Sequence, residues 1–342
     1  MKSLKGKRLA VAFFPVVLPI LAQSPVPGAA NPRYTVTDLG TLGGTYSEAF
    51  AINGSGSVVG DSSTADGSGH AFLYSGGVLL DLNLPGTSST ARSINRSGQI
   101  AGYYYDGSYQ GYVDTDGQIT DVGNLGALYS AAYALNASAQ ACGSSMTSSN
   151  NEHAFLWSGG VITDINPFGG SYSAASGINA SGQVVGYGYL PNGNFHAFVR
   201  TGTTSRDLGT LGGDWSEADA INDSGRVVGQ AYLAANVKAH AFLWSGSGAL
   251  KDLGQLGGSY SQALAVNSTT TQIVGRASVP DPEFIVYHAF LYANGKMKDL
   301  NRLIPSGSGW VLSEATGIND AGQIVGSGTV HGQQHAFLLN PR

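Results

Sequence analysis

A sequence unit that recurs seven times constrains this chain more than any other feature. Each copy carries, in fixed order, a marker asparagine after an aliphatic residue, a His-Ala-Phe triplet and an Asp-aliphatic-Gly/Asn triplet. In the second copy the His-Ala-Phe triplet is degenerate, Gln110-Gly111-Tyr112. Such a period indicates one supersecondary unit per copy, stacked against its neighbours. We number the repeats 1 to 7 by their markers, which are Asn53, Asn95, Asn136, Asn179, Asn222, Asn267 and Asn319.

Each repeat reads as four short strands. In repeat 5 these are 216–222, 226–232, 240–245 and 249–254, rich in β-branched or aromatic residues and bounded by glycine, serine or asparagine. Asn222 and the three residues after it predict a tight hairpin turn. Four antiparallel strands at this period predict an all-β, seven-bladed β-propeller of four-stranded antiparallel blades. An open β-solenoid is the alternative, and it fits such long units poorly.

The two ends of the repeat region are complementary. Residues 34–40 carry an Asp triplet before any first strand, and the last repeat ends after His335-Ala336-Phe337 without a fourth strand. We therefore expect 34–40 to pair with 335–340, complete the seventh blade and close the ring. Closure removes the exposed strand edges that favour aggregation.

The first residues have the pattern of an export signal. Basic residues from Lys2 to Arg8 precede an apolar run over 9–22, which is too short to span a bilayer comfortably. Residues 1–30 are therefore predicted to be a secretory signal with a short linker, and 31–342 a single propeller domain, secreted or periplasmic. A membrane anchor is the alternative; after signal removal we expect no membrane association.

Composition excludes several classes of function. The net charge of −5 gives no footprint for nucleic acid. The single cysteine, Cys142, cannot form an internal disulfide and is expected to be a small buried residue. No phosphate-binding loop, zinc-type cysteine spacing or nucleophile elbow is present. "DTDG" (114–117) is interpreted as a hairpin turn rather than a calcium site. We predict no cofactor, no metal site and a monomer.

One known family shares this pattern. The string "DLGTLGG", followed by "AIN", "SG", "VVG" and "HAFLW", resembles the bacterial extracellular HAF repeat, named after its His-Ala-Phe triplet. The resemblance covers essentially all of the chain after the signal. It implies export and a propeller-like repeat domain, and it supplies no catalytic residues. Repeat 2 departs most, with Gln110 in place of the histidine.

The histidines are numerous but are not expected to lie together. Six of the seven open the recurrent triplet, one per repeat, so they should be spread around a ring and predict no shared metal site. We expect each to hydrogen-bond within its own blade, to a recurrent serine or the recurrent aspartate. A Ser-His-Asp triad is the alternative, but one active site needs one set of residues. The triplet histidines are His70, His153, His196, His240, His288 and His335.

An aromatic series precedes the marker asparagines. Seven residues before the marker, where the loop enters the first strand, most repeats place a tyrosine or tryptophan, whereas repeats 2 and 7 have Ser88 and Leu312. Such rings stack on sugar faces, so they are candidate ligand-binding residues; packing between blades is the alternative. The candidates are Tyr46, Tyr129, Tyr172, Trp215 and Tyr260, together with Trp310 near the start of repeat 7.

Carboxylates break the repeat five residues before the marker. Glu48, Glu217 and Glu314 stand at this position, with Gln262 in repeat 6 and uncharged residues elsewhere. Since repeats 7 and 1 become neighbours when the ring closes, Glu48 and Glu314 are expected at one side of the channel mouth. They are candidate ligand-binding residues. In the alternative they are catalytic with Glu217, or are simply solvated.

The connections between second and third strands add further candidates. Residues 102–110 and 186–195 are rich in tyrosine, asparagine and glycine, a composition typical of recognition loops. They contribute Tyr104, Asp106 and Tyr189. The fourth-to-first connections should lie on the same face, so this face is the predicted functional one.

Three functions are compatible with these residues. The first prediction is an exported, non-catalytic binding module for carbohydrate or an extracellular surface. The second is a polysaccharide-active lyase or glycosidase that uses Glu48, Glu217 or Glu314. The third is a structural or adhesive repeat protein.

Overall fold

The computed structural model describes residues 33–342. The predicted secretory segment, residues 1–30, lies outside this range. Within it the chain forms 28 β-strands, the 3-10 helices η1 (Ala234–Asn236) and η2 (Leu300–Arg302), and no α-helix. The same residues contain no helix of the length and hydropathy needed to span a bilayer.

The strands follow the repeats in chain order. Before repeat 1 comes β1 (Tyr34–Asp38). Repeats 1 to 3 form β2 (Gly43–Ile52), β3 (Val58–Thr64), β4 (Gly69–Ser75), β5 (Val78–Asp81), β6 (Ser88–Ile94), β7 (Ile100–Tyr105), β8 (Tyr109–Thr115), β9 (Gln118–Asp121), β10 (Gly126–Leu135), β11 (Ala141–Thr147), β12 (Glu152–Ser158) and β13 (Val161–Asp164). Repeats 4 to 7 form β14 (Ser173–Ile178), β15 (Val184–Tyr189), β16 (Phe195–Thr201), β17 (Thr204–Asp207), β18 (Gly212–Ile221), β19 (Val227–Leu233), β20 (Ala239–Trp244), β21 (Lys251–Asp252), β22 (Ser261–Val266), β23 (Ile273–Val279), β24 (Val286–Ala293), β25 (Lys296–Asp299), β26 (Val311–Ile318), β27 (Ile324–Val330) and β28 (Gln333–Pro341).

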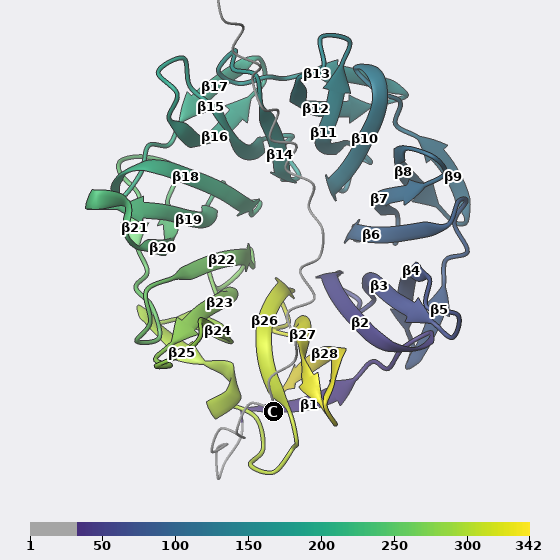
Figure 1. Cartoon of the computed structure of the whole chain (residues 1–342), viewed down its shortest axis with the longest axis vertical. Helices are drawn as coiled ribbons and strands as arrows, with labels where there is room; N and C mark the ends of the chain where they lie inside the picture. Colours follow the sequence, from purple (N-terminus) through teal and green to yellow (C-terminus); the bar gives the residue numbers. More distant parts are fainter. Residues whose placement is uncertain (1–32) are drawn as a thin grey trace, which may run out of the picture.

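The strands are arranged radially. Figure 1 shows β2, β6, β10, β14, β18, β22 and β26, the first strands of the repeats, nearest the central axis and the other strands further out. Within each repeat, consecutive strands pair antiparallel. The all-β prediction is confirmed, and this radial arrangement of antiparallel sheets is a β-propeller.

The hydrogen-bonded sheets do not coincide with the repeats everywhere. Three sheets have four strands, but two have eight. Each larger sheet spans two repeats that are joined by a single parallel residue pair, Tyr46 with Gln334 in one and Phe195 with Trp215 in the other. The hydrogen-bonded sheets alone therefore do not establish the number of blades as seven, and none of the sheets closes on itself.

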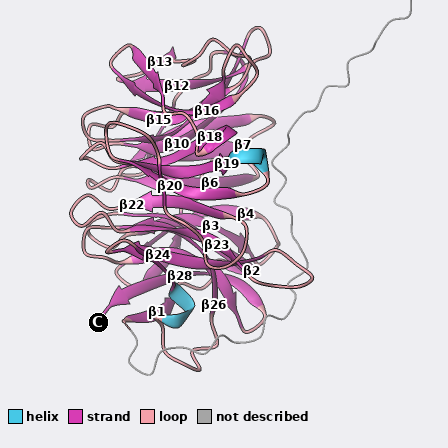
Figure 2. Ribbon diagram, turned by 90° about the vertical axis from the view of Figure 1, so that its left-hand side faces the viewer, coloured by secondary structure: helices cyan, strands magenta, loops and turns pink. Residues whose placement is uncertain are grey.

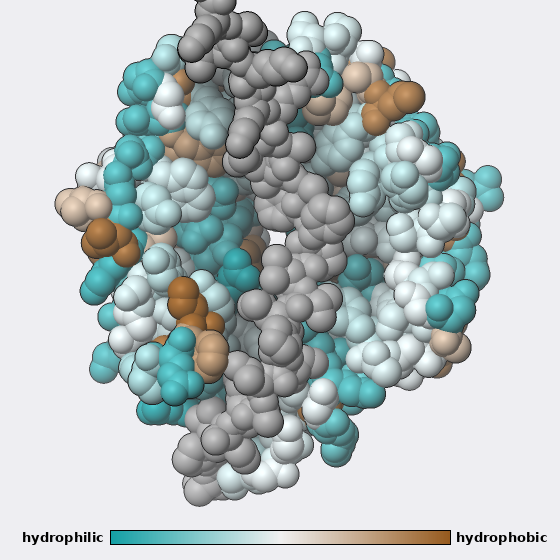
Figure 3. Space-filling view, in the orientation of Figure 1, coloured by the Kyte–Doolittle hydropathy of each residue, from teal (hydrophilic) through white to brown (hydrophobic). Residues whose placement is uncertain are grey.

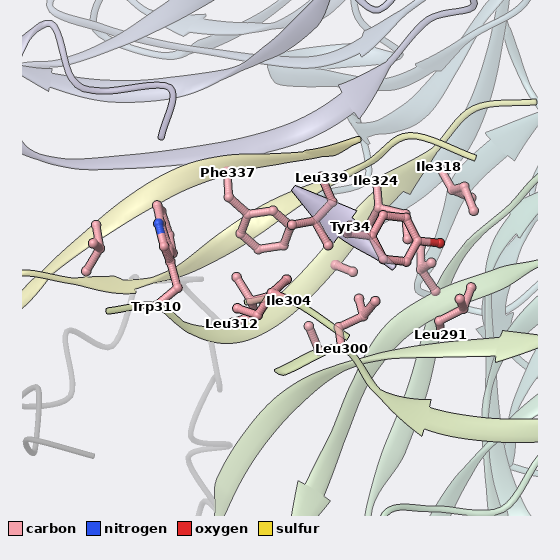
Figure 4. Close-up of a cluster of buried hydrophobic side chains, with 14 residues drawn as sticks. Tyr34, Leu291, Leu300, Ile304, Trp310, Leu312, Ile318, Ile324, Phe337 and Leu339 are labelled. Carbon is pink, nitrogen blue, oxygen red and sulfur yellow. The ribbon is translucent and has the colours of Figure 1, made fainter. Parts of the chain in front are cut away.

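The N-terminal strand completes the last repeat, as the sequence predicted. β1 pairs antiparallel with β28, in a register that runs from Tyr34–Pro341 to Asp38–Phe337. Tyr34 is buried in a cluster with Phe337 and Leu339, so apolar packing reinforces the pairing. Figure 4 shows these side chains in one layer, with residues of repeats 6 and 7 beside them.

The His-Ala-Phe triplet explains much of the core. Its alanine and its phenylalanine are fully buried in all six intact copies, and Tyr112 takes the place of the phenylalanine in repeat 2. Close packing between neighbouring sheets leaves room for only a methyl group at the alanine. Cys142 is fully buried and unpaired, as predicted. The phenylalanines are Phe72, Phe155, Phe198, Phe242, Phe290 and Phe337.

A recurrent glycine in the second strand has a steric cause. The register of β18 against β19 shifts between Ala218 and Ala220, where the first strand bulges. A Cβ atom on Gly229 would lie 2.0 Å from the carbonyl oxygen of Glu217. Only glycine permits this close approach of the two strands. The glycine therefore holds the backbone of the first strand at Glu217, one of the non-repeating carboxylates.

The marker asparagines link one repeat to the next. The Nδ2 group of each donates to the main-chain oxygen of the following marker at 2.9–3.2 Å in six cases, the last being Asn319 to Asn53. Asn267 is the exception: its amide donates to Thr270 and Gln272 in its own turn. All these turns join a first strand to a second strand, so the topology places them on one face of the molecule. In side view, loops lie on two opposite faces (Figure 2).

Candidate functional site

The repeated histidines lie within hydrogen-bond distance of aspartates of the scaffold. In each of six repeats the Nδ1 atom lies 2.7–3.0 Å from a carboxylate oxygen of the aspartate on the adjacent fourth strand. In repeat 7 this partner is Asp38 of β1, which ties the two ends of the chain together. Among residues 33–342, no group of three or more His, Cys, Asp or Glu side chains is arranged to hold a metal ion.

The recurrent serines form hydrogen bonds with the backbone of the preceding repeat and not with the histidines. Ser216 Oγ accepts a hydrogen bond from the backbone N–H of Ala197, the triplet alanine of the preceding repeat, at 2.9 Å. The same contact recurs from Ala336 to Ser47. The hydrogen bonds of the serine therefore join neighbouring repeats, whereas the aspartate is the partner of the histidine.

The non-repeating carboxylates lie along the central channel. Glu48, Glu217 and Glu314 are on the first strands β2, β18 and β26, which bound the axis. Figure 3 shows an opening near the middle of the molecule with hydrophilic side chains beside it. The channel, which we define by the seven first strands, thus has a polar lining on the side of repeats 5 to 1.

A chain of polar contacts crosses three repeats along this side. Asp219 accepts from Gln262 Nε2 at 3.1 Å, and the Oε1 atom of Gln262 accepts from Arg276 at 3.0 Å. Arg276 then pairs with Glu314 at 2.9 Å. The chain continues electrostatically to Glu48, because the charge of Glu314 raises the pKa of Glu48.

Burial raises the pKa of most of these carboxyl groups. For Glu48, burial and then the charge of Glu314 raise the pKa to about 8. Burial raises the pKa of Glu217 to about 7 and that of Asp61 to about 6. The pKa of Asp219 is also raised, by burial and by Glu217. In the lining, only Glu314 has a salt-bridge partner within residues 33–342.

Sequence reasoning missed four charged residues of this lining. Asp61 lies directly across the sheet from Glu48, and Arg276 across from Gln262, so these side chains share a face. Arg92 and Asp219 stand two residues after the non-repeating position of their first strands. The residue type at these positions also varies among the repeats. Comparing the repeats position by position, as was done for Glu48, would find these residues if the comparison included the rest of the first strand and the second strand.

The other side of the channel is lined by tyrosines. Tyr129 Oη lies 3.2 Å from Tyr133 Oη, which lies 3.2 Å from Ser144 Oγ. The rings of Tyr103 and Tyr133 meet edge to face, with centroids 6.5 Å apart. Tyr172 stacks on Tyr187 at 6.4 Å. The channel therefore has an aromatic side over repeats 2 to 4.

The two sides meet at Tyr187. Burial, and then the charges of Glu217 and of nearby groups, raise the pKa of Tyr187. On the opposite side Tyr46 donates from Oη to Glu48 at 2.6 Å. A tyrosine hydroxyl therefore lies close to a carboxyl group at each of the two places where the aromatic and acidic sides join: Tyr187 near Glu217, and Tyr46 beside Glu48.

The remaining predicted residues lie in different parts of the molecule. Trp215 stacks on Phe195, and Tyr189, the last residue of β15, is 42% exposed. Tyr260 lines a shallow pocket on the same face. Asp106 is exposed in the turn after β7.

Two predicted ligand-binding residues are placed otherwise. Trp310 is 7% exposed and packs edge to face on Phe337, because the segment before β26 folds it into the core (Figure 4). Tyr104 packs against Tyr112 in the cluster between repeats 1 and 2. Neither ring points into the channel lining, so neither contributes to the candidate site.

Comparisons with known proteins bear on the fold. No protein-family model matches the chain, and no curated protein matches it. Among solved structures, the β-propeller domain of the Trilobed protease from Pyrococcus furiosus is similar, with a TM-score of 0.55 and 8% identity over 89% of this chain and 95% of that one.

Two peptidases have similar structures over part of their length. A puromycin hydrolase mutant has a TM-score of 0.56 and 11% identity over 84% of this chain. A puromycin-hydrolyzing peptidase of Mycobacterium tuberculosis has a TM-score of 0.55 and 10% identity over 88%. The chain covers 51% and 52% of these two proteins. These likenesses confirm the β-propeller fold.

The prediction of a carbohydrate-binding module is corrected by these comparisons. Three propellers similar to this one belong to a protease or to peptidases rather than to carbohydrate-binding proteins, which contradicts the carbohydrate prediction. The physical error lies in the aromatic series. Tyr46 is hydrogen-bonded to Glu48, Trp215 is stacked on Phe195 and Trp310 is buried, so the series does not present a row of free ring faces.

Proposed function

We propose that the chain is a propeller of seven four-stranded blades, each eight-stranded sheet being two blades joined by one bridging pair. The repeat supports this proposal, because the marker asparagine and the Asp triplet each occur seven times, in alternation along the sequence. We also retain as proposals the HAF-type membership and export that the repeat and the basic, apolar N-terminus suggest.

We propose that the channel binds the cationic part of a peptide. The observation that carries this proposal is the excess of desolvated carboxylates on the acidic side. The lining holds five carboxyl groups, Glu48, Asp61, Glu217, Asp219 and Glu314, and two guanidinium groups, Arg92 and Arg276.

The two arginines offset only part of the negative charge of this lining, because two guanidinium groups face five carboxyl groups. Arg276 is committed to Glu314 and Gln262, and Arg92 lies over the ring of Phe50 at 4.1 Å. One carboxylate oxygen of Asp61, Oδ1, is buried without a hydrogen-bond partner in the described part of the chain. An ammonium or guanidinium group would supply both the missing donor and the missing positive charge.

The tyrosines favour the same class of ligand. A cation is attracted to the face of an aromatic ring, and tyrosine hydroxyls also accept or donate hydrogen bonds to peptide groups. A lysine or arginine side chain in the channel would have carboxylates on one side and Tyr133 and Tyr187 on the other. This pairing distinguishes an organic cation from a metal ion, which would require converging oxygen ligands.

The peptide class rests on one further support. The similar propellers come from proteins named as a protease and peptidases, whose ligands are peptides or related amides. Because the chain covers only about half of the two peptidases, their activity does not transfer with the fold. We therefore limit the proposal to binding of a peptide.

Calorimetric titration of the full chain at pH 8.5 tests this proposal. The probe is a pentapeptide, blocked at both ends, with one lysine between alanines; the control peptide carries Nζ-acetyl-lysine in its place. We expect only the charged peptide to bind, and Glu217→Gln to weaken binding about tenfold, as the loss of one charged hydrogen bond implies. Asp116→Asn, in an exposed turn far from the channel, is the matched control.

Protonation gives an independent readout. A bound cation favours the ionised forms of Glu48 and Glu217, so binding should release protons and strengthen as the pH rises from 6 to 9. Titrations in buffers of different ionisation enthalpy measure this release. Equal affinity for the charged and acetylated peptides, or binding independent of pH, would show that the channel does not recognise a cation.

A further inference from the structure

Most of the large apolar side chains that are exposed lie on one face of the molecule. Seven of them stand near the start of a first strand, or in the connection between second and third strands or at the strand ends beside it. The marker turns, which join first to second strands, lie on the opposite face, so the topology places these seven around the same end of the channel. They are Tyr105, Tyr109, Leu128, Tyr189, Val237, Phe284 and Ile285.

These seven residues, which we call the rim, are distinct from the other exposed apolar residues. Val78, Leu80, Ile119 and Val161 lie on the fourth strands β5, β9 and β13, away from the axis. Figure 1 shows these strands at the outer edge. Val78 and Leu80 share β5, whereas Ile119 and Val161 are single residues in other repeats; such scattered apolar residues are found on most protein surfaces and provide a comparison for the rim.

On the aromatic side the rim is continuous with the channel lining. Tyr109 meets the rings of Tyr103 at 5.6 Å and Tyr129 at 6.1 Å, both of which belong to the channel side. Tyr189 similarly contacts Tyr172 at 6.4 Å. A series of aromatic rings in contact therefore leads from the exposed rim to the tyrosines of the channel lining.

Across the mouth, repeat 6 presents a second apolar element. The loop between β23 and β24 carries Phe284 and Ile285, 54% and 61% exposed, beside a shallow pocket that Tyr260 also lines. Asp281 Oδ1 accepts from the backbone N–H groups of Glu283 and Phe284 at 3.0 and 2.8 Å. These bonds hold the loop in a turn in which the side chains of Phe284 and Ile285 are exposed to solvent.

We infer that the partner is an extended segment of another protein in which a lysine or arginine is flanked on both sides by apolar residues. The inference rests on the proposed function: the basic side chain enters the acidic channel while the flanking residues contact the tyrosine rim and the Phe284 loop. Charge complementarity fixes the centre of this segment, and the two apolar elements on opposite sides of the mouth fix its ends.

Fluorescence anisotropy with two labelled peptides tests the inference. The short probe is the blocked pentapeptide with central lysine; the long probe adds a phenylalanine and a leucine on each side. We expect the long probe to bind at least tenfold more tightly. The double variant Phe284→Ser, Ile285→Ser should lose this gain and keep the affinity for the short probe. Val78→Ser, Val161→Ser, on the outer edge, is the matched control and should bind both probes as the parent chain does.

The possible outcomes separate this inference from the proposed function. If the short probe binds but the long probe binds no better, the rim is not a contact surface and the inference fails alone. If neither probe binds, both fail. Concentration-dependent dimerisation of the chain that Phe284→Ser, Ile285→Ser abolishes would also overturn the inference, because the rim would then contact a second copy.

Discussion

Asn319 donates from Nδ2 to the main-chain oxygen of Asn53 at 3.0 Å, although 266 residues separate them. This bond joins the last repeat to the first on the face of the marker turns. It belongs to a series of six such bonds, and the one between repeats 6 and 7 is absent in the described structure because Asn267 donates within its own turn. The bonds are buried, so each should contribute measurably to stability.

Asn319→Asp should lower the free energy of unfolding by about 2 kcal/mol, since it removes the donor to Asn53 and keeps the oxygen that caps the turn. Asn267→Asp is the matched control and should cost clearly less, because its amide makes no bond to the next repeat. Urea titration followed by tryptophan fluorescence measures both values. Equal losses would mean that the inter-repeat bond has no separate effect.

Gly229→Ala should destabilise the chain by at least about 2 kcal/mol, because its Cβ atom would meet the carbonyl oxygen of Glu217 at 2.0 Å. Gly54→Ala should change stability by less than about 0.5 kcal/mol, since nothing lies within 4 Å of a Cβ at that position. Thermal melts compare the two. A Gly229→Ala variant as stable as Gly54→Ala would show that the bulge can relax at little cost.

The stability of the chain should fall as the pH rises from 5 to 9. The folded-state pKa values of Glu48 and Asp61, about 8 and about 6, lie above their ordinary values. Groups with raised pKa contribute stability that is complete below pH 4 and lost as the pH rises through the folded-state values. Glu48→Gln should therefore raise the melting temperature at pH 9, have little effect at pH 5, and flatten the profile. A profile unchanged by Glu48→Gln would contradict this account.

His288→Ala should destabilise the chain more than any substitution of an exposed histidine. His288 and Asp299 form the most buried of the six pairs, with side chains 10% and 9% exposed. Removing the imidazole takes away the closest partner of Asp299 Oδ2, while Oδ1 keeps its hydrogen bonds from Asn301, so the expected cost is about 2 kcal/mol. His331→Asn, in an exposed turn with φ of +52° that asparagine tolerates, is the control. Chemical denaturation near pH 6 measures the difference.

The repeat made most of the fold predictable. It placed β1 beside β28 and paired the histidines with scaffold partners, because recurrence around a ring implies that each copy makes the same contacts. It left open whether those partners were serines or aspartates, since Ser47 and Asp38 recur equally well in the sequence. Only the register of the strands decides that Asp38 meets His335.

The candidate site was predictable in part. Glu48 and Glu314 were found because they break the repeat, but Asp61 and Arg276 lie on second strands, and their closeness depends on cross-strand register. Trp310 was assigned to the site from its distance to the marker. It lies instead in the core, because the longer connection before β26 includes η2 and folds back onto β28.

The pairing of β1 with β28 has a consequence for synthesis. A ribosome makes β1 before β28, so β1 has no partner until β28 has been translated. Intermediate repeats can pair internally as they emerge, but Tyr34 and Asp38 must wait for Phe337 and His335. Pairing of β1 should therefore be a late step of folding, and a chain stalled before β28 would leave β1 without its partner strand.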